Sequence, residues 1–196
     1  MHSDTTSMAN GRAKTLEELE IQFTTIGARA KALVESAGPD LCSRPPAPGS
    51  WSVAECLQHL NVIADAYFPV WQQIIANAGP RKAALNAPYQ TDFWGRLISW
   101  ILEPPARIRS KTPLPFQPVD CGTVDSVLAD FLARQQRIVA TLGRCRGRAI
   151  DTVRIASPVD KRINYSIWSS FLVSAAHERH HLWQAEQALR KLRSEK

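Results

Sequence analysis

Cysteine is scarce in this sequence and follows no pattern. None of the four cysteines belongs to a CxxC pair; they are Cys42, Cys56, Cys121 and Cys145. In a chain of 196 residues this spacing favours reduced thiols over a disulfide framework. The first segment, MHSDTTSMANGR, also lacks the apolar stretch of a secretion signal. We therefore expect a cytoplasmic protein.

Long apolar runs are also absent. The best candidate for a membrane span is FWGRLISWILEPPARI, which begins at Phe93 and is interrupted by Arg96. A helix needs about 20 apolar residues to cross a bilayer, so this segment is too short. We expect no membrane partner.

The chain is basic but lacks the features of a nucleic-acid-binding surface. Its net charge of +6 is spread over short clusters such as RIRSK at 107–111, RCRGR at 144–148 and RKLRSEK at 190–196. Aromatic residues do not alternate with these clusters in a stacking pattern, and no helix-turn-helix or RNA-binding signature is present. The pattern favours a solvated basic surface, with a small molecule rather than nucleic acid as partner.

Apolar residues recur at helical spacing, and no segment shows convincing alternation of period two. Proline- and glycine-rich loops separate the periodic segments. The long helices expected are 15–36, 52–78, 123–143 and 166–192, with a short amphipathic helix at about 93–102. We therefore predict an all-α fold, an antiparallel four-helix bundle with a long connection between helices 2 and 3. Residues 1–14 would form a flexible N-terminal tail and residues 15–193 a single domain.

The second of these helices carries clear boundary signals. Ser52 and Glu55 stand three residues apart and form the pattern of a capping box. Gly79 and Pro80 end the helix near Ala78. Pro69 lies inside it, and predicts a kink or an early break.

The last helix contains HERHH at 177–181, which holds three of the five histidines. His177 and His181 are four residues apart, so both imidazoles project from one helix face, at a spacing that suits one metal ion. The same stripe continues through Ser170, Ser174 and Gln184. Two inward histidines with a polar continuation favour a metal site over a single satisfied core histidine.

A third ligand is available in the second helix. His2 falls in the tail, so His59 is the remaining histidine. Together His59, His177 and His181 would supply three nitrogens and leave one position for water or substrate, as in catalytic sites. Zinc and nickel suit three imidazoles best, and iron is a further option. Cys56 is better explained as a packed core thiol than as a fourth ligand.

The HERHH segment also matches the HExxH pattern, in which Glu178 would be the general base of a zinc protease. A downstream acidic ligand would have to be Glu186 or Glu195. Glu186 falls on a different helix face, and Glu195 lies at the end of the chain. We therefore reject the protease interpretation.

Two segments together resemble a known family. RPPAPGSWSVAECLQHL, followed far downstream by NYSIWSSFLVSAAHERHHLWQAEQAL, is similar to the DinB-like superfamily, named for DNA-damage-inducible proteins. The resemblance spans about residues 15–192. It implies a four-helix bundle with a three-histidine divalent metal site, and its ligand positions match His59, His177 and His181. His180 falls outside the pattern.

Other residues near the motifs have less defined roles. Glu178 matches a position that is often acidic in the family, but no catalytic role follows from that. Gln184 is a candidate hydrogen-bond partner of a ligating histidine. Trp51 is interpreted as packing at the entrance to the second helix.

The resemblance also implies thiol chemistry, because better-understood branches use bacillithiol, mycothiol or glutathione in metal-dependent transfer or isomerisation. We therefore expect a thiol-dependent S-transferase that acts on small electrophiles. A metal-dependent hydrolase and a non-catalytic, stress-associated metal-binding bundle remain as alternatives, the latter as a homodimer through exposed residues such as Trp94 and Trp100. Spacing does not decide which arginine would bind the thiol's carboxylates; the candidates are Arg107, Arg109, Arg154 and Arg162.

Overall fold

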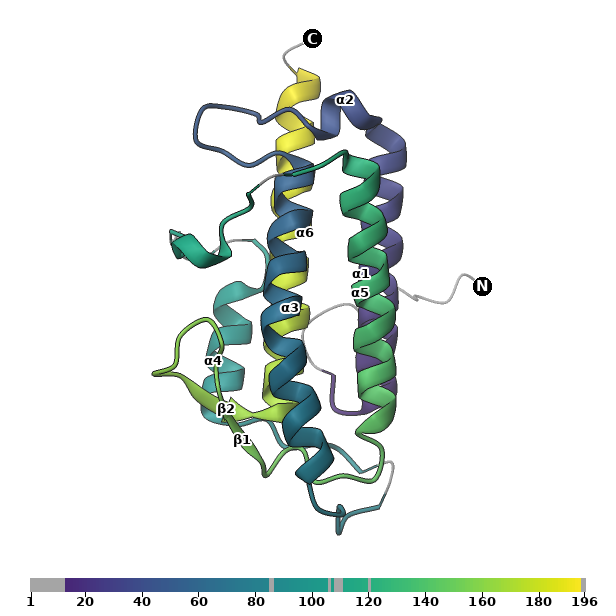
Figure 1. Ribbon diagram of the computed structural model, residues 1–196, viewed down its shortest axis with the longest axis vertical. Coiled ribbons are helices and arrows are strands. Elements are labelled where there is room, and N and C mark those ends of the chain that lie inside the picture. Colours follow the sequence, from purple (N-terminus) through teal and green to yellow (C-terminus); the bar gives the residue numbers. More distant parts are fainter. Residues whose placement is uncertain (1–12, 85–86, 106, 108–110, 120, 195–196) are drawn as a thin grey trace, which may run out of the picture.

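The computed structural model describes residues 13–84, 87–105, 107, 111–119 and 121–194. Four long helices lie side by side in it (Figure 1). They are α1 (Leu16–Ala37), α3 (Val53–Asn77), α5 (Val124–Arg144) and α6 (Ile167–Ser194). The sequence predicted all four to within about two residues at each end. The predicted all-α class is confirmed, and His2 and residues 1–12 of the predicted tail lie outside the described residues.

The helix ends follow the capping signals in the sequence. Ser52 accepts from the backbone N–H of Glu55, and the Glu55 carboxylate accepts from the N–H of Ser52, so the predicted capping box is present. Thr15 and Glu18 form a second capping box at the start of α1. Pro69 predicted a kink or an early break; the early break is wrong, because α3 continues through this residue to Asn77, near the end expected at Ala78.

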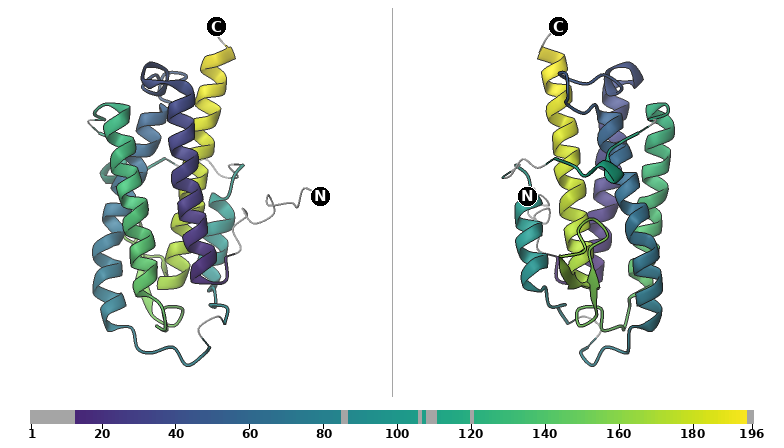
Figure 2. Two further views of the ribbon diagram at one scale, coloured as in Figure 1. Left: turned by 90° about the vertical axis from the view of Figure 1, so that its right-hand side faces the viewer. Right: turned by 60° about the vertical axis from the view of Figure 1, so that its left-hand side comes forward.

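Each long helix packs against two of the others. α1 contacts α5 and α6, and α3 contacts the same two helices. The two views in Figure 2 show the same arrangement. Their shared core contains aromatic side chains with almost no exposed surface; the largest are Trp71, Trp168, Tyr165, Phe23, Phe68, Phe131 and Phe171. Burial of this apolar surface is the main source of stability in such a core.

A short helix, α4 (Phe93–Leu102), lies against α6 at the bounds that the sequence predicted. A Cβ atom on Gly95 would lie 2.4 Å from both Cβ and Oγ of Ser169, so only glycine allows this close approach. The Asp92 carboxylate accepts from the N–H groups of Gly95 and Ser166. α4 is therefore fixed to the start of α6.

Four small elements were not predicted. β1 (Arg154–Ala156) and β2 (Asn164–Ser166) form an antiparallel hairpin where the sequence predicted a loop. Each strand has three residues, too few to show a period of two. α2 (Pro39–Cys42) begins with proline at a position where helices tolerate it, and the 3₁₀-helix η2 (Leu114–Phe116) follows α4.

The surface bears on two further expectations. No helix among the described residues is long and apolar enough to cross a membrane. Trp94 and Trp100 on α4 are 42% and 59% exposed. A homodimer through this face stays a prediction.

At the predicted tail boundary, Ala13 is buried and the Lys14 carbonyl accepts from the N–H of Tyr89 at 2.8 Å.

Candidate metal centre

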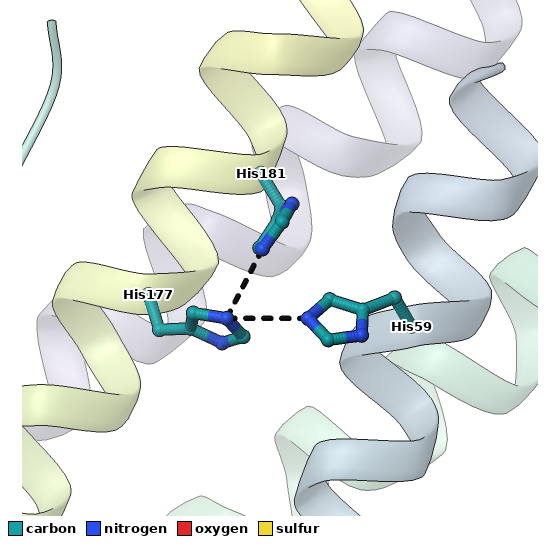
Figure 3. Close-up of side chains that lie close together, drawn as sticks. All are labelled: His59, His177 and His181. Carbon is teal, nitrogen blue, oxygen red and sulfur yellow. Dashed lines mark hydrogen bonds between the residues drawn. The ribbon is translucent and has the colours of Figure 1, made fainter. Parts of the chain in front are cut away.

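The imidazoles of His59, His177 and His181 converge between α3 and α6. The Nε2 atom of His177 lies 3.2 Å from that of His59 and 3.0 Å from that of His181 (Figure 3). The ligand atoms of all three lie within 4.8 Å of one another. The structure thus brings together the three residues that the sequence selected, although His59 and His177 are 118 positions apart in the chain.

Packing between α3 and α6 sets the register that allows this meeting. Trp71, three turns after His59 on α3, donates from its indole N–H to Ser170 Oγ on α6 at 2.8 Å. Its ring stacks on Phe171 with centroids 4.3 Å apart. These contacts fix how far α3 is shifted along α6, and with this shift His59 lies opposite His177 and His181.

Two acceptors fix how the imidazoles present their nitrogens. The Nδ1 atom of His59 lies 2.6 Å from the carbonyl oxygen of Phe116 in η2, and that of His181 lies 3.0 Å from Gln184 Oε1. An oxygen without a proton can only accept, so each Nδ1 carries the hydrogen in the neutral ring. The Nε2 lone pairs of His59 and His181 therefore both face His177.

This arrangement is not satisfied by hydrogen bonds alone. If neutral His177 carries its hydrogen on Nε2, this N–H group can donate to only one of the two facing lone pairs. The other lone pair then faces His177 without a hydrogen bond. A cation at the point of convergence would satisfy all three. Nitrogen ligands about 2.0–2.1 Å from a tetrahedral ion lie roughly 3.3 Å apart, close to the 3.2 and 3.0 Å that separate Nε2 of His177 from those of His59 and His181. The donor set thus fits a divalent metal ion.

The electrostatic surroundings keep the imidazoles neutral. Burial, followed by the neighbouring imidazoles, holds the pKa of His177 and of His181 well below the ordinary value. Burial also lowers the pKa of His59, although its hydrogen bond to Phe116 opposes the shift. Metal ions bind the neutral form of histidine, so the three rings are in the state that ligation requires.

The histidines line the wall of a cavity of about 1250 Å³. Trp51 also lines it, with its ring centroid 5.0 Å from that of His59 and 5.6 Å from that of His181. The sequence interpretation of Trp51 as packing at the helix entrance missed this contact with the site. Phe116 was missed too, because a backbone carbonyl leaves no signal in the sequence.

The cavity extends in both directions from the histidines along α6. Toward the C-terminus its lining includes Lys191, and Lys111 lines it from the loop before η2. Neither ammonium group pairs with a carboxylate of the described residues. Toward the start of α6, the lining passes Ser174 and Val173 to Tyr165. The polar stripe predicted on this helix therefore faces the cavity from Ser174 onward, whereas Ser170 is buried against Trp71.

The rest of the HERHH segment consists of Glu178, Arg179 and His180, none of which belongs to the three-histidine group. Glu178 is 4% exposed, does not line the cavity, and its carboxyl group has a pKa raised to about 8 by burial. Arg179 is 5% exposed and forms a bidentate ion pair with Glu103 at 2.8 Å. His180 lines the cavity, with Nδ1 3.1 Å from the carbonyl oxygen of Leu102. Glu178 thus lacks the position of a protease base, which adds to the sequence argument against a protease from Glu186 and Glu195.

The arginines considered as thiol ligands are engaged elsewhere. Arg107 stacks over Trp100, Arg154 donates to Asn164, and Arg162 pairs with Asp160. Arg109 lies outside the described residues. Cys56 is fully buried with a pKa raised by burial, and it is not part of the three-histidine group.

Comparisons with known proteins place the chain in a family. No curated protein and no solved structure matches it. A family model described as the DinB superfamily matches residues 22–185, which contain the three converging histidines, all of α3 and α5, and most of α1 and α6. The chain belongs to the DinB superfamily.

Proposed function

We propose that this chain is a metal-dependent enzyme, a thiol-dependent S-transferase that joins a low-molecular-weight thiol to a small electrophile. The observation that carries the proposal is the convergence of three imidazoles, two held with Nε2 lone pairs inward, on the wall of a large cavity. His59, His177 and His181 would hold the ion, with zinc or nickel the expected metal. A bound divalent ion supplies the means to lower the pKa of a coordinated thiol.

The size of the cavity favours two substrates. Sites for one drug-sized ligand occupy about 300–1,000 Å³, and this cavity is about 1250 Å³. The space extends to both sides of the histidines, so one molecule can lie on each side of the reacting centre. A transferase needs this arrangement and a hydrolase does not.

Two positive charges in the lining favour an acidic thiol. Lys111 and Lys191 both line the cavity, and neither pairs with a described carboxylate. Cellular thiols such as glutathione carry carboxylates, which these ammonium groups would bind. We therefore propose that Lys111 and Lys191, rather than any of the four arginines considered from the sequence, bind the carboxylates of the thiol.

A metal-dependent hydrolase remains the second candidate. It would need a base near the attacking water, and the nearest carboxylate by sequence, Glu178, does not line the cavity. Asp160 does line the cavity, but it pairs with Arg162 at 2.8 Å. These positions favour the transferase over the hydrolase.

A non-catalytic metal-binding protein is the third candidate.

For each of these functions we propose that the four long helices form the antiparallel bundle predicted from the sequence, with α4 and η2 in the connection between α3 and α5. A cytoplasmic location stays a prediction of the sequence.

The test is turnover by purified, zinc- or nickel-loaded protein without a histidine tag. Glutathione, bacillithiol and mycothiol are each supplied with 1-chloro-2,4-dinitrobenzene, from which a sulfur–carbon bond forms, chloride leaves and the thiol proton passes to solvent. We expect acceleration by at least one thiol, and its loss in His177→Ala. No acceleration with any thiol would contradict the proposal. Cleavage of p-nitrophenyl acetate without a thiol would favour the hydrolase.

A further inference from the structure

One end of the cavity has a character of its own. From His59 and His177 toward the start of α6, its wall is formed mainly by aliphatic side chains from α3, α4, α6 and the segment between β1 and β2. We call this part the apolar arm; it is lined by Ile63, Ile98, Ile163, Val173, Tyr67 and Tyr165. Figure 2 shows the hairpin lying across this end of α3 and α6.

Two tyrosines form the polar end of the apolar arm. The hydroxyl groups of Tyr67 and Tyr165 hydrogen-bond to each other, and Ser157 lies within hydrogen-bonding reach of both. The Tyr67 ring stacks on Trp71 with centroids 5.0 Å apart. Both phenols are held in place by the core, with exposures of 3% and 1%.

The hydrogens of these three hydroxyls can be counted. Ser157 Oγ accepts from the N–H groups of Val159 and Asp160, so its own hydrogen is free to be donated to a tyrosine oxygen. One tyrosine then donates to the other. The hydrogen of the second tyrosine has no acceptor in this set, and both tyrosines line the cavity. The pair therefore has one donor left for a ligand.

A second hydroxyl in the apolar arm lacks a partner. Ser174 lines the cavity one turn before His177, and it is 6% exposed. Its Oγ atom is buried and has no hydrogen-bond partner among the described residues. A buried polar group without a partner is costly, and such groups in native sites commonly await a ligand or water.

The apolar arm also has no free charge. The phenols stay protonated at neutral pH, because burial raises the pKa of both Tyr67 and Tyr165. Asp160 at its edge is neutralised by Arg162, 2.8 Å away. A charged ligand would lose its hydration here without gaining a counter-charge, which disfavours it strongly.

We propose that the apolar arm binds the electrophilic substrate, an uncharged and mainly apolar small molecule whose far end carries a hydrogen-bond acceptor such as a carbonyl oxygen. The Tyr67–Tyr165 pair donates to this acceptor, and Ser174 contacts the middle of the molecule. The assignment of this ligand as the electrophile rests on the proposed transferase function; the binding site itself does not.

The helix geometry sets the length of such a molecule. Tyr67 follows His59 by two turns of α3, which corresponds to about 12 Å along the axis. A substrate with its acceptor at the tyrosines and its reactive carbon beside the histidines therefore spans roughly this distance. Tyr67 and Tyr165 are binding and positioning residues in this account.

Acetophenone and ethylbenzene are suitable probes, because they differ in one carbonyl group. Binding of each to the metal-free full-length chain is measured by ligand-observed NMR. Tyr67→Phe/Tyr165→Phe lacks the hydroxyl donors, so it should bind acetophenone more weakly relative to ethylbenzene. The dissociation constant of acetophenone divided by that of ethylbenzene should therefore rise about tenfold. Tyr89→Phe is the matched control, since Tyr89 does not line the cavity, and it should leave the ratio unchanged. An unchanged ratio in the double variant would overturn the proposal.

A measurement on the wild-type protein covers the case in which the double variant does not fold. The infrared carbonyl stretch of bound, ¹³C-labelled acetophenone should lie below its position in hexane, because donation by a tyrosine weakens the C=O bond. A stretch at the hexane position, or no binding of acetophenone at millimolar concentration, would overturn the proposal. Neither probe needs metal or thiol, so this result is separate from success or failure of the proposed transferase function.

Discussion

The Nδ1 atom of His59 lies 2.6 Å from the carbonyl oxygen of Phe116, 57 residues further along the chain. The contact ties α3 to η2 and turns Nε2 of His59 toward His177. Gln184 does the same for His181 from one turn along α6. Partners of this kind orient ligating imidazoles and raise their affinity for metal.

Gln184→Ala should therefore weaken zinc binding while leaving all three imidazoles present. We expect a loss of about 10–100-fold in affinity, because the His181 ring loses the acceptor that fixes its tautomer. Competition with a chromophoric zinc chelator measures the change. Gln187→Ala is the control, since Gln187 also lines the cavity but is not among the hydrogen-bond partners of the three histidines. Equal affinities for the two variants would show that the Gln184 contact does not support the site.

Glu103→Gln tests the buried ion pair that holds the end of α4 against α6. Arg179 would lose its bidentate carboxylate and keep a charge that is 7% exposed. We expect a loss of about 2–4 kcal/mol in the free energy of unfolding, measured with urea. Glu186→Gln breaks the exposed Arg29–Glu186 pair between α1 and α6 and should cost less than about 1 kcal/mol. Similar losses for both would contradict this distinction.

Helix boundaries and the three histidines could be predicted because their signals are local. The Ser52–Glu55 capping box lies within one turn, and His177 and His181 share a face by spacing alone. His59 followed from the scarcity of histidine and from the family resemblance. These features need no knowledge of how the helices pack.

The missed features depend on contacts between distant segments. Phe116 contributes a backbone oxygen, which any residue would provide. Trp51 lies near imidazoles from both α3 and α6, and the packing of these two helices leaves no local signal in the sequence. The hairpin was missed because each of its strands has three residues. Of the kink or early break expected at Pro69, the break is absent: α3 continues through this residue, with Phe68 and Trp71 buried on either side of it.

Gly95→Ala should displace α4. The added Cβ would lie 2.4 Å from Ser169 Cβ, and neither backbone can move without opening the α4–α6 contact. We expect a loss of about 1–3 kcal/mol in the free energy of unfolding. Gly143→Ala in α5 is the matched control, because nothing lies within 4 Å of its added Cβ, and it should be neutral or stabilising. Equal effects of the two substitutions would contradict the close packing.

Glu178→Gln should change the dependence of stability on pH. The pKa of Glu178 is raised from 4.5 to about 8 by burial, so between these values the folded state holds a proton that the unfolded state releases. Wild-type stability is therefore lost as pH rises from about 5 to 8, whereas the variant lacks this loss. The free energy of unfolding of the variant, relative to wild type, should therefore rise between pH 5 and pH 8 by a few kcal/mol at most, since each pKa unit corresponds to about 1.4 kcal/mol.

Urea unfolding of both metal-free proteins at pH 5 and pH 8 measures this difference. The histidines contribute equally to both proteins and cancel in the comparison. A constant difference between variant and wild type across this range would mean that Glu178 is not buried as a protonated acid.

Metal stoichiometry is the most direct test of the three-histidine centre. Protein without a histidine tag is loaded with zinc, dialysed and assayed by inductively coupled plasma mass spectrometry, alongside His59→Ala, His177→Ala, His181→Ala and the control His180→Ala. We expect one zinc ion per chain in the wild type and in His180→Ala, and far less in the other three. A wild type without zinc, or full occupancy in those three variants, would contradict the site.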